Sequence, residues 1–323
     1  MLAELIKNLE PYLEQVNQYI SEKLNTDIQL LQLVENHILH SNGKRIRPVL
    51  HILASLICGP VKQANIIVAS TSEFIHTATL LHDDVIDNSA TRRGKPTVNN
   101  LWGNELSVMV GDFFYTQSMN SLLEIGNLTV VQIFSTATQM MTEGEIIQHE
   151  NMGNIDIQLD DYLNIIYRKT AVLFSACCES AAVLADFPAE RIRNWAQFGK
   201  NLGIAFQLID DLLDYNGVEA VTGKPGFNDL MENKLTMPLI HAIKNGTKQD
   251  LKKIQAILQA DQKNEEHVKF VADFVEAQGG LTATNALALE YQERAVANLD
   301  SFQQTDFYES MISLAEYIVH RVR

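Results

Sequence analysis

Largely apolar residues recur along most of this chain at steps of three and four. Between about residues 62 and 88 this spacing is followed by Ile67, Thr71, Phe74, Ala78 and Leu81. Such a period is typical of a helix that buries one stripe of its surface. We find no alternating apolar and polar strand bounded by a hairpin turn of the Asn-Gly type. The pattern therefore predicts an all-α protein.

Short segments rich in glycine, proline and polar residues interrupt the helical stretches. Examples are SNGK (41–44), SATRRGKPT (89–97) and YNGVEAVTGKPGFND (215–229). These breaks divide the chain into about a dozen helices. None of the connections has the length or composition of a domain linker. We therefore expect one large helical bundle that forms a single domain over residues 1–323.

The composition is that of a globular protein, because 46% of the 323 residues are hydrophobic and 20% are charged. No uninterrupted apolar run approaches the roughly 18 residues of a membrane-spanning helix. The first residues lack the basic start and apolar core of a signal peptide. The three cysteines form no CxxC pair. We expect a cytoplasmic protein without a transmembrane segment.

The charge balance is strongly acidic. The chain has 25 Lys and Arg residues against 40 Asp and Glu residues, a formal net charge of -15. This excess disfavours non-specific binding to nucleic acid or to anionic lipid. Any polyanionic ligand must therefore be bound by a local basic cluster, and no nucleic acid partner is expected.

Two motifs of the form DDxxD follow apolar helical segments. They consist of Asp83, Asp84 and Asp87, and of Asp210, Asp211 and Asp214. On a helix, each motif directs three carboxylates over roughly one quadrant. Residues that commonly end helices follow both motifs, namely Asn88-Ser89 and Asn216-Gly217. Both motifs are thus expected at the C-terminal ends of helices.

Carboxylates at a helix C-terminus are disfavoured by the helix dipole. Six of them at two such ends indicate an external cation. Oxygen ligands favour Mg²⁺, which commonly joins a few carboxylates to substrate phosphates. Zinc is disfavoured because neither motif has histidine or cysteine at ligand spacing. One such motif alone is equally consistent with a solvated acidic helix end, but two make a metal site the better explanation.

Three basic segments accompany the acidic motifs: GKRIRP (43–48), TRRGKP (91–96) and TGKPGFNDLMENK (222–234). In so acidic a chain, arginine and lysine clusters near metal-binding carboxylates suggest a phosphorylated ligand. The alternative is that these arginines pair with the aspartates as surface salt bridges. That alternative does not explain why both signs of charge are concentrated in loops at helix ends.

These segments, in order, closely resemble those of the trans-type polyprenyl diphosphate synthases. The resemblance rests on GKRIRP, on EFIHTATLLHDDVID, on TRRGKPT, on YRKTA and on FQLIDDLLDY, and it extends from about residue 25 to the C-terminus. Several segments look most like the bacterial octaprenyl diphosphate synthases. The resemblance implies an all-α bundle around a deep central cavity, and usually a homodimer.

The resemblance also implies a role for individual residues. The two aspartate motifs would bind Mg²⁺, more than one ion per site, on an allylic diphosphate. Arg92 would contact that diphosphate, and isopentenyl diphosphate would be bound by Lys44, Arg47, His76 and Arg93. The allylic side would further include Lys169, Thr170, Gln207, Lys224 and Lys234. No general base is evident, and by resemblance the departing pyrophosphate accepts the proton.

The reaction implied is the repeated condensation of isopentenyl diphosphate with an allylic primer such as farnesyl diphosphate. In this family, residues four and five before the first motif help to set product length, and here they are Thr79 and Ala78. Both are small, which favours a long product such as octaprenyl diphosphate for a quinone side chain. Phe134 is a candidate floor of the cavity or an ordinary core residue. An apolar product is also consistent with transient membrane contact when the product is released.

The third basic segment departs from the family pattern, because Phe227 and Asn233 replace glycines, and Asn228 and Leu235 also differ. Glycine would permit backbone angles that Phe227 and Asn233 resist. There are two alternative functions. A class I terpene cyclase would have Asn, Ser or Thr and Glu in its second metal motif, whereas this chain has DDLLD. A non-catalytic subunit of a heteromeric synthase would be expected to have lost carboxylates or arginines, which this chain retains.

Overall fold

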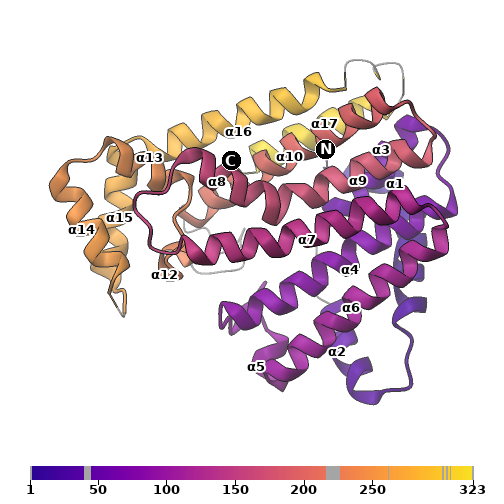
Figure 1. Ribbon diagram of the computed structural model, residues 1–323, viewed down its shortest axis with the longest axis horizontal. Helices are drawn as coiled ribbons and strands as arrows, with labels where there is room; N and C mark the ends of the chain where they lie inside the picture. Colours follow the sequence, from indigo (N-terminus) through magenta and orange to yellow (C-terminus); the bar gives the residue numbers. More distant parts are fainter. Residues whose placement is uncertain are drawn as a thin grey trace. The chain divides into compact units, whose positions relative to one another are not determined.

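The computed structural model describes residues 2–39, 45–215, 226–260, 262–299, 302, 305 and 307–321. Within these ranges the chain is helical apart from its connections and one small hairpin (Figure 1). The predicted all-α class is confirmed. No helix in the described part of the chain is both long and apolar enough to cross a lipid bilayer.

The described chain groups into two compact units, each assembled from three segments. Unit 1 comprises residues 1–138, 173–199 and 298–314, and unit 2 comprises residues 139–172, 200–297 and 315–323. The chain passes from one unit to the other within α7 (Leu128–Glu150) and within α10 (Ala189–Tyr215). The expectation of one domain over residues 1–323 stays a prediction.

Unit 1 contains the first acidic motif and the first two basic segments. Besides the first part of α7 and of α10, its elements are α1 (Leu2–Leu24), α2 (Gln29–Leu39), α3 (Ile46–Cys58), α4 (Gln63–Ile86), β1 (Thr91–Arg92), β2 (Lys95–Pro96), α5 (Val98–Trp102), α6 (Asn104–Ile125), most of α9 (Val172–Leu184) and the start of α17 (Tyr308–His320).

Unit 2 contains the second acidic motif and the third basic segment. Besides the later parts of α7, α10 and α17, its elements are α8 (Leu159–Ile166), the π-helix η1 (Tyr167–Ala171), α12 (Asn228–Met231), α13 (Met237–Asn245), α14 (Lys248–Leu258), α15 (Glu265–Ala277) and α16 (Gly280–Ala297). Helices α13, α15 and α16 pack on one another (Figure 1).

Helix α4 is the central element of unit 1, and it confirms the helix predicted over residues 62–88. At its start, the side chain of Asn65 accepts a hydrogen bond from the backbone N–H of Lys62 at 2.9 Å. Along its length it lies side by side with α6 (Figure 1), where Phe74 and Phe114 meet edge to face with ring centroids 6.0 Å apart. At its end, Asn88 adopts the left-handed conformation with φ 49°. This packing fixes the direction in which the first aspartate motif points.

A buried polar network joins α3, α4 and α9 within unit 1. Nδ1 of His51 donates to the backbone oxygen of Cys177 at 2.8 Å. Oγ of Ser55 donates to the backbone oxygen of His51 at 2.8 Å, and Nδ2 of Asn65 donates to that same Oγ at 2.9 Å. Because His51 has no solvent exposure, burial lowers its pKa to about 4.

We expect this histidine to make the folded state sensitive to acid. Below its unfolded pKa near 6.5, His51 takes up a proton in the unfolded chain but not in the folded one, so stability falls as the pH decreases toward 4. The full difference is about 3 kcal/mol. The buried carboxyl of Glu35, with its pKa raised to about 7, acts in the opposite direction.

The measurement is therefore a comparison of urea unfolding between the wild type and His51→Gln at several pH values. The difference in unfolding free energy between the two proteins should shrink steadily from pH 7 to pH 4. A difference that does not change with pH would mean that His51 has the same pKa in the folded and unfolded chains.

Candidate active site

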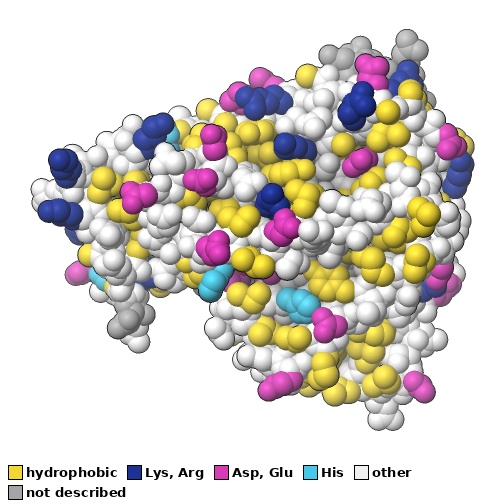
Figure 2. Space-filling view, in the orientation of Figure 1, with side chains coloured by type: hydrophobic (Ala, Val, Ile, Leu, Met, Phe, Trp, Pro, Cys, Tyr) yellow, Lys and Arg dark blue, Asp and Glu magenta, His cyan; other side chains and the backbone are white. Residues whose placement is uncertain are grey.

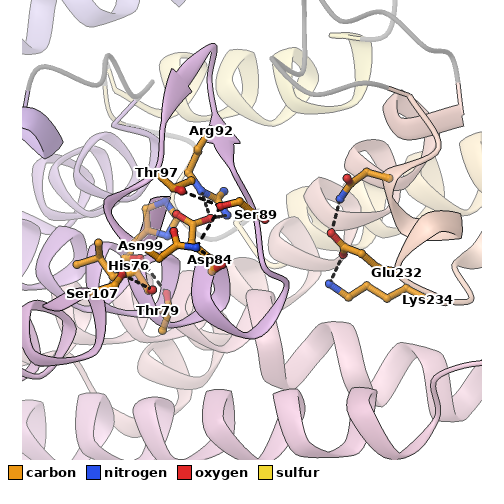
Figure 3. Close-up of polar contacts among 12 residues, drawn as sticks. His76, Thr79, Asp84, Ser89, Arg92, Thr97, Asn99, Ser107, Glu232 and Lys234 are labelled. Carbon is orange, nitrogen blue, oxygen red and sulfur yellow. Dashed lines mark hydrogen bonds and ion pairs between the residues drawn. The ribbon is translucent and has the colours of Figure 1, made fainter. Parts of the chain in front are cut away.

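The first acidic motif lies in the last turn of α4, as predicted. Asp83 and Asp87 are half-buried, whereas Asp84 is only 4% exposed. Arg92 donates from Nε at 2.9 Å and from Nη2 at 2.7 Å to Oδ1 of Asp84 (Figure 3). The middle aspartate, Asp84, thus forms a salt bridge with Arg92, whereas Asp83 and Asp87 are accessible to solvent.

The segment after α4 is fixed against the helix end. Strands β1 and β2 pair Thr91 with Pro96 and Arg92 with Lys95, around a turn in which Arg93 and Gly94 both have positive φ. Two positive φ values at the centre of a two-residue turn match the twist of a hairpin. The segment was expected only as a break between helices, and the small hairpin was missed because its turn is Arg-Gly rather than Asn-Gly.

Side chains that follow the hairpin complete this anchoring (Figure 3). Oγ1 of Thr97 donates to the backbone oxygen of Ser89 at 2.7 Å. Nδ2 of Asn99 donates to the backbone oxygens of Asp84 at 3.1 Å and of Ser89 at 3.2 Å. Backbone carbonyl groups at and just after the end of α4 therefore accept hydrogen bonds. The loop that carries Arg92 is held in place by these bonds, and it positions Arg92 against Asp84.

Basic groups gather near the middle of α4 in unit 1. The guanidinium groups of Arg45, Arg47, Arg92 and Arg93 lie close enough to His76 to lower its pKa well below the usual value, although burial is the larger cause. The guanidinium of Arg47 also lies over the ring of Phe174, 5.2 Å from its centroid. The structure thus brings the predicted Arg47, His76 and Arg93 together, while Lys44 lies outside the described residues.

The second acidic motif lies in the last turn of α10, also as predicted. Asp211 is 2% exposed, its Oδ2 accepts from the hydroxyl of Tyr162, and its Oδ1 accepts from Nε2 of Gln207 at 3.0 Å. Gln207 in turn accepts from Oγ1 of Thr170 at 2.8 Å. Burial raises the pKa of Asp211 to about 7, and the bonds from Tyr162 and Gln207 act against this rise.

The outer aspartates of the second motif have partners of their own. Oδ1 of Asp210 lies 2.8 Å from Nη2 of Arg321. The two carboxylate oxygens of Asp214 accept from the backbone N–H groups of Asn228 at 3.0 Å and of Asp229 at 3.1 Å. Asp214 therefore satisfies N–H groups at the start of α12, as a capping side chain does.

Lys169 and Thr170 lie in η1, a π-helical turn of the kind often found at functional sites. Nζ of Lys169 is 2.5 Å from Oε2 of Glu145 and 2.8 Å from Oε1 of Gln148, both on α7. A Cβ atom at Gly144 would come within 2.8 Å of the backbone nitrogen of Lys169. Glycine is needed here so that α7 can approach η1.

The third basic segment shows why its departures from the family pattern matter. Phe227 and Asn233 have φ values of 64° and 59°, the left-handed region that glycine adopts most readily. Both positions therefore keep the conformation expected of glycine, and their side chains make that backbone conformation strained. Nζ of Lys234 is 2.6 Å from Oε2 of Glu232 (Figure 3). Lys224 lies outside the described residues.

The donor sets fit a metal that keeps part of its shell of water. In the described part of the chain, no set of three or more Asp, Glu, His or Cys side chains is arranged to hold an ion unaided. Mg²⁺ does not need such a cage, since it takes one or two carboxylates together with water and phosphate oxygens. The half-buried Asp83 and Asp87 on one helix face suit that coordination.

The three candidate product-length residues all belong to unit 1. Ala78 on α4 and Phe134 on α7 have no solvent exposure. Thr79 is half-buried, and its Oγ1 donates to the backbone oxygen of His76 at 2.8 Å (Figure 3). Ala78 is thus a core position on the helix that ends in the first motif.

Several residues that complete these clusters were not assigned to the site from the sequence. They are Arg45 and Glu73 near His76, Tyr162 beside Asp211, Glu145 and Gln148 beside Lys169, and Arg321 beside Asp210. Arg45 lies in GKRIRP, and its membership of a basic motif was an available signal. Glu73 is the first residue of EFIHTATLLHDDVID. The remaining residues lie outside the quoted segments, and only the folded chain brings them to the site.

Comparison with known sequences agrees with this assignment. The polyprenyl synthetase family model matches residues 28–275. The chain is 41% identical over 309 residues to the octaprenyl diphosphate synthase of Escherichia coli, covering 95% of both chains. It is 35% identical over 312 residues to the all-trans-nonaprenyl-diphosphate synthase of Rhodobacter capsulatus, covering 95% of this chain and 94% of that one.

Solved structures give the same result. A decaprenyl diphosphate synthase from Rhodobacter capsulatus superposes with a TM-score of 0.94 and 35% identity over the whole of both chains. A polyprenyl synthase from Caulobacter crescentus, complexed with calcium and isoprenyl diphosphate, gives a TM-score of 0.95 and 33% identity over 99% of this chain and 97% of that one. The chain therefore belongs to the polyprenyl synthetase family, and it is a trans-prenyltransferase that makes polyprenyl diphosphates.

Proposed function

We propose that this prenyltransferase makes octaprenyl diphosphate, from farnesyl diphosphate and isopentenyl diphosphate, for a quinone side chain. The likeness to the octaprenyl synthase of Escherichia coli supports this product. The small side chains Ala78 and Thr79 before the first motif also favour a long chain. A cytoplasmic location is part of the same proposal.

The observation that carries the proposal is the combination of acidic and basic groups in unit 1. Two half-buried aspartates end α4, and Arg92 is held beside them. Arg45, Arg47 and Arg93 form a cationic cluster around His76 on the same helix. Carboxylates that suit Mg²⁺ and guanidinium groups that suit phosphate oxygens are what two diphosphate substrates require.

The proposed roles follow from this placement. Asp83 and Asp87 bind Mg²⁺ for the allylic diphosphate, and Asp84 directs Arg92 toward it. Lys44, Arg47, His76 and Arg93 bind isopentenyl diphosphate. In unit 2, the second motif binds further Mg²⁺, so that more than one ion takes part. The side chains that complete the allylic site are Lys169, Thr170, Gln207, Lys224 and Lys234.

The chemistry begins with cleavage of the carbon–oxygen bond of the allylic diphosphate. Bound Mg²⁺ supplies positive charge to the pyrophosphate leaving group. Cationic donors such as Arg92 stabilise the charge that develops as the bond breaks. The double bond of isopentenyl diphosphate then attacks the allylic cation. We propose that the departing pyrophosphate accepts the proton lost in the last step, and that Thr170 and Gln207 face the cation without transferring a proton.

The assay that tests the function uses purified protein, Mg²⁺, farnesyl diphosphate and labelled isopentenyl diphosphate. A ladder of polyprenyl diphosphates that ends at eight isoprene units supports the proposal, and a different end point corrects the product length. A cyclic hydrocarbon would indicate a class I terpene cyclase. No turnover by a folded protein would indicate a non-catalytic subunit of a heteromeric synthase.

We also propose that the protein is a homodimer formed through unit 1. Figure 2 shows hydrophobic side chains gathered over α6, and the most exposed ones on α6 and the start of α7 are Met109, Leu123 and Leu128, at 58%, 61% and 79%. Exposed apolar residues grouped in this way mark protein interfaces. Sedimentation equilibrium should show a dimer for the wild type and monomers for Met109→Arg/Leu123→Arg. Ile28→Arg, at the residue just before α2 and equally exposed at 58%, is the control that should remain dimeric.

Replacing Ala78 with tyrosine should shorten the products. The new ring must enter a fully buried position on α4, where a growing chain longer than the primer would compete with it for space. Overpacking should also cost about 1–3 kcal/mol of stability. Mass spectrometry of the products measures the effect, and chain lengths equal to those of the wild type in a folded, active variant would contradict it.

A further inference from the structure

One ion pair in the cationic cluster of unit 1 has no role in the function proposed above. Nη1 of Arg45 lies 2.7 Å from Oε2 of Glu73. The Glu73 side chain is 11% exposed and that of Arg45 is 29% exposed. Glu73 lies on α4, three residues before His76, so both side chains project from the same side of the helix. A buried carboxylate is thus placed inside a cluster that otherwise suits an anion.

The backbone of Arg45 also points to a special role. Arg45 precedes α3 with φ 48° and ψ 34°, the left-handed conformation, which is unfavourable for a residue with a side chain. Such strain persists only where surrounding interactions maintain it, and it concentrates at functional sites. The bond to Glu73 is an interaction of this kind, because it ties the Arg45 side chain to α4.

The electrostatic surroundings agree with this geometry. Arg93 is exposed to solvent, yet neighbouring groups crowd its guanidinium. Partial loss of hydration and the positive charges of Arg92 and Arg45 lower its pKa, while Glu73 acts in the opposite direction. Glu73 therefore offsets repulsion among like charges before any substrate arrives.

We propose that Glu73 is the internal counter-charge of this cluster, and that it limits the affinity of the cluster for a diphosphate group. This inference rests on the proposed role of the cluster in binding isopentenyl diphosphate. Without ligand, Glu73 holds Arg45 in place and reduces repulsion among the arginines. With ligand, the same carboxylate repels the incoming diphosphate, so that binding is weaker than the cationic groups alone would give.

The consequence is a pair of opposite effects in Glu73→Gln. The amide oxygen of glutamine can still accept a hydrogen bond from Arg45, but the negative charge is gone. We expect the ligand-free variant to unfold at a lower temperature than the wild type. We expect it to bind inorganic pyrophosphate and isopentenyl diphosphate about five-fold more tightly. The gain should shrink as salt is added, because salt screens interactions between partly exposed charges.

The experiment is calorimetric titration of the full chain with pyrophosphate and with isopentenyl diphosphate, in EDTA, alongside thermal unfolding. EDTA removes divalent ions, so that binding reports on the cationic side chains. Glu124→Gln is the matched control, because Glu124 also forms an ion pair in unit 1, with Lys23, and accepts from Tyr19 at 3.0 Å. It should lose stability without a change in diphosphate affinity.

Further variants separate failure of this inference from failure of the proposed function. Arg93→Ala should bind isopentenyl diphosphate more weakly, which tests the cluster itself. If Arg93→Ala binds weakly but Glu73→Gln binds no more tightly than the wild type, Glu73 is only a structural residue and the inference is wrong. If neither the wild type nor Arg93→Ala binds, the proposed site is wrong.

If Glu73→Gln does not fold, a second pair of variants tests the same proposal. Arg45→Gln removes one positive charge and should bind pyrophosphate more weakly than the wild type. Arg45→Gln/Glu73→Gln removes one charge of each sign, and it should fold and bind pyrophosphate about as well as the wild type. Binding by the double variant that is as weak as in Arg45→Gln would overturn the counter-charge role.

Discussion

Asp83→Asn should lower kcat by about 1,000-fold or more, with little change in the stability of the protein. Asp83 is half-buried at the end of α4, where solvent, and in our proposal Mg²⁺, can reach its carboxylate. Removing the charge weakens the binding of the Mg²⁺ that would stabilise the leaving pyrophosphate. Electrostatic stabilisation of this kind commonly supplies several kcal/mol. The concentration of Mg²⁺ needed for half-maximal activity should rise in parallel.

Asp84→Asn is the informative comparison, because it changes the neighbouring carboxylate on the same turn. Asp84 is buried and bonded to Arg92, so its replacement should raise the KM for the allylic substrate and reduce stability, while leaving the Mg²⁺ requirement nearly unchanged. Steady-state kinetics at several Mg²⁺ concentrations and urea unfolding make both measurements. An equal shift in Mg²⁺ requirement for the two variants would show that Asp84 is a metal ligand like Asp83.

Arg92→Ala and Arg93→Ala, although adjacent, should affect different substrates. Arg92 is the partner of Asp84, and Arg93 lies with Arg45 and His76. Loss of a charge-assisted contact to a diphosphate is worth about 1.5–3 kcal/mol, or roughly tenfold to a hundredfold in KM. We therefore expect a higher KM for farnesyl diphosphate in Arg92→Ala and for isopentenyl diphosphate in Arg93→Ala.

Stability provides an independent readout for the same two variants. Arg92→Ala leaves the carboxylate of Asp84, which is 6% exposed as a side chain, without its partner, and breaking such a pair costs about 3 kcal/mol. Arg93 is exposed at the turn of the hairpin, so Arg93→Ala should unfold nearly as the wild type does. Identical kinetic defects in the two variants would contradict the assignment of separate substrates.

Helical class and the positions of both motifs could be predicted because they depend on local properties of the chain. The period of apolar residues defines α4. Asn88 follows its end in the left-handed conformation, which asparagine adopts more readily than most residues. The hairpin at Arg92 could not be predicted in this way. Its strands are two residues long, too short to show alternation.

The candidate site was predictable where one motif supplies all the side chains, and not where distant segments supply them. Asp210, Asp211 and Asp214 are visible as DDLLD, but nothing near them in sequence indicates Tyr162, 49 residues away, or Arg321. The positive φ of Phe227 and Asn233 is an intermediate case. Because these two residues replace glycines of the family pattern, the sequence indicated backbone strain here, and the structure shows it as positive φ.

The π-helical turn η1 makes the site sensitive to a change in chain length. A π turn holds one more residue than an α turn, so deletion of a single residue within 167–171 would allow α8 to continue as a regular α-helix. Lys169 and Thr170 would then rotate together away from Glu145, Gln148 and Gln207. A one-residue deletion here should therefore be far more damaging than most point substitutions, even though the segment would remain helical.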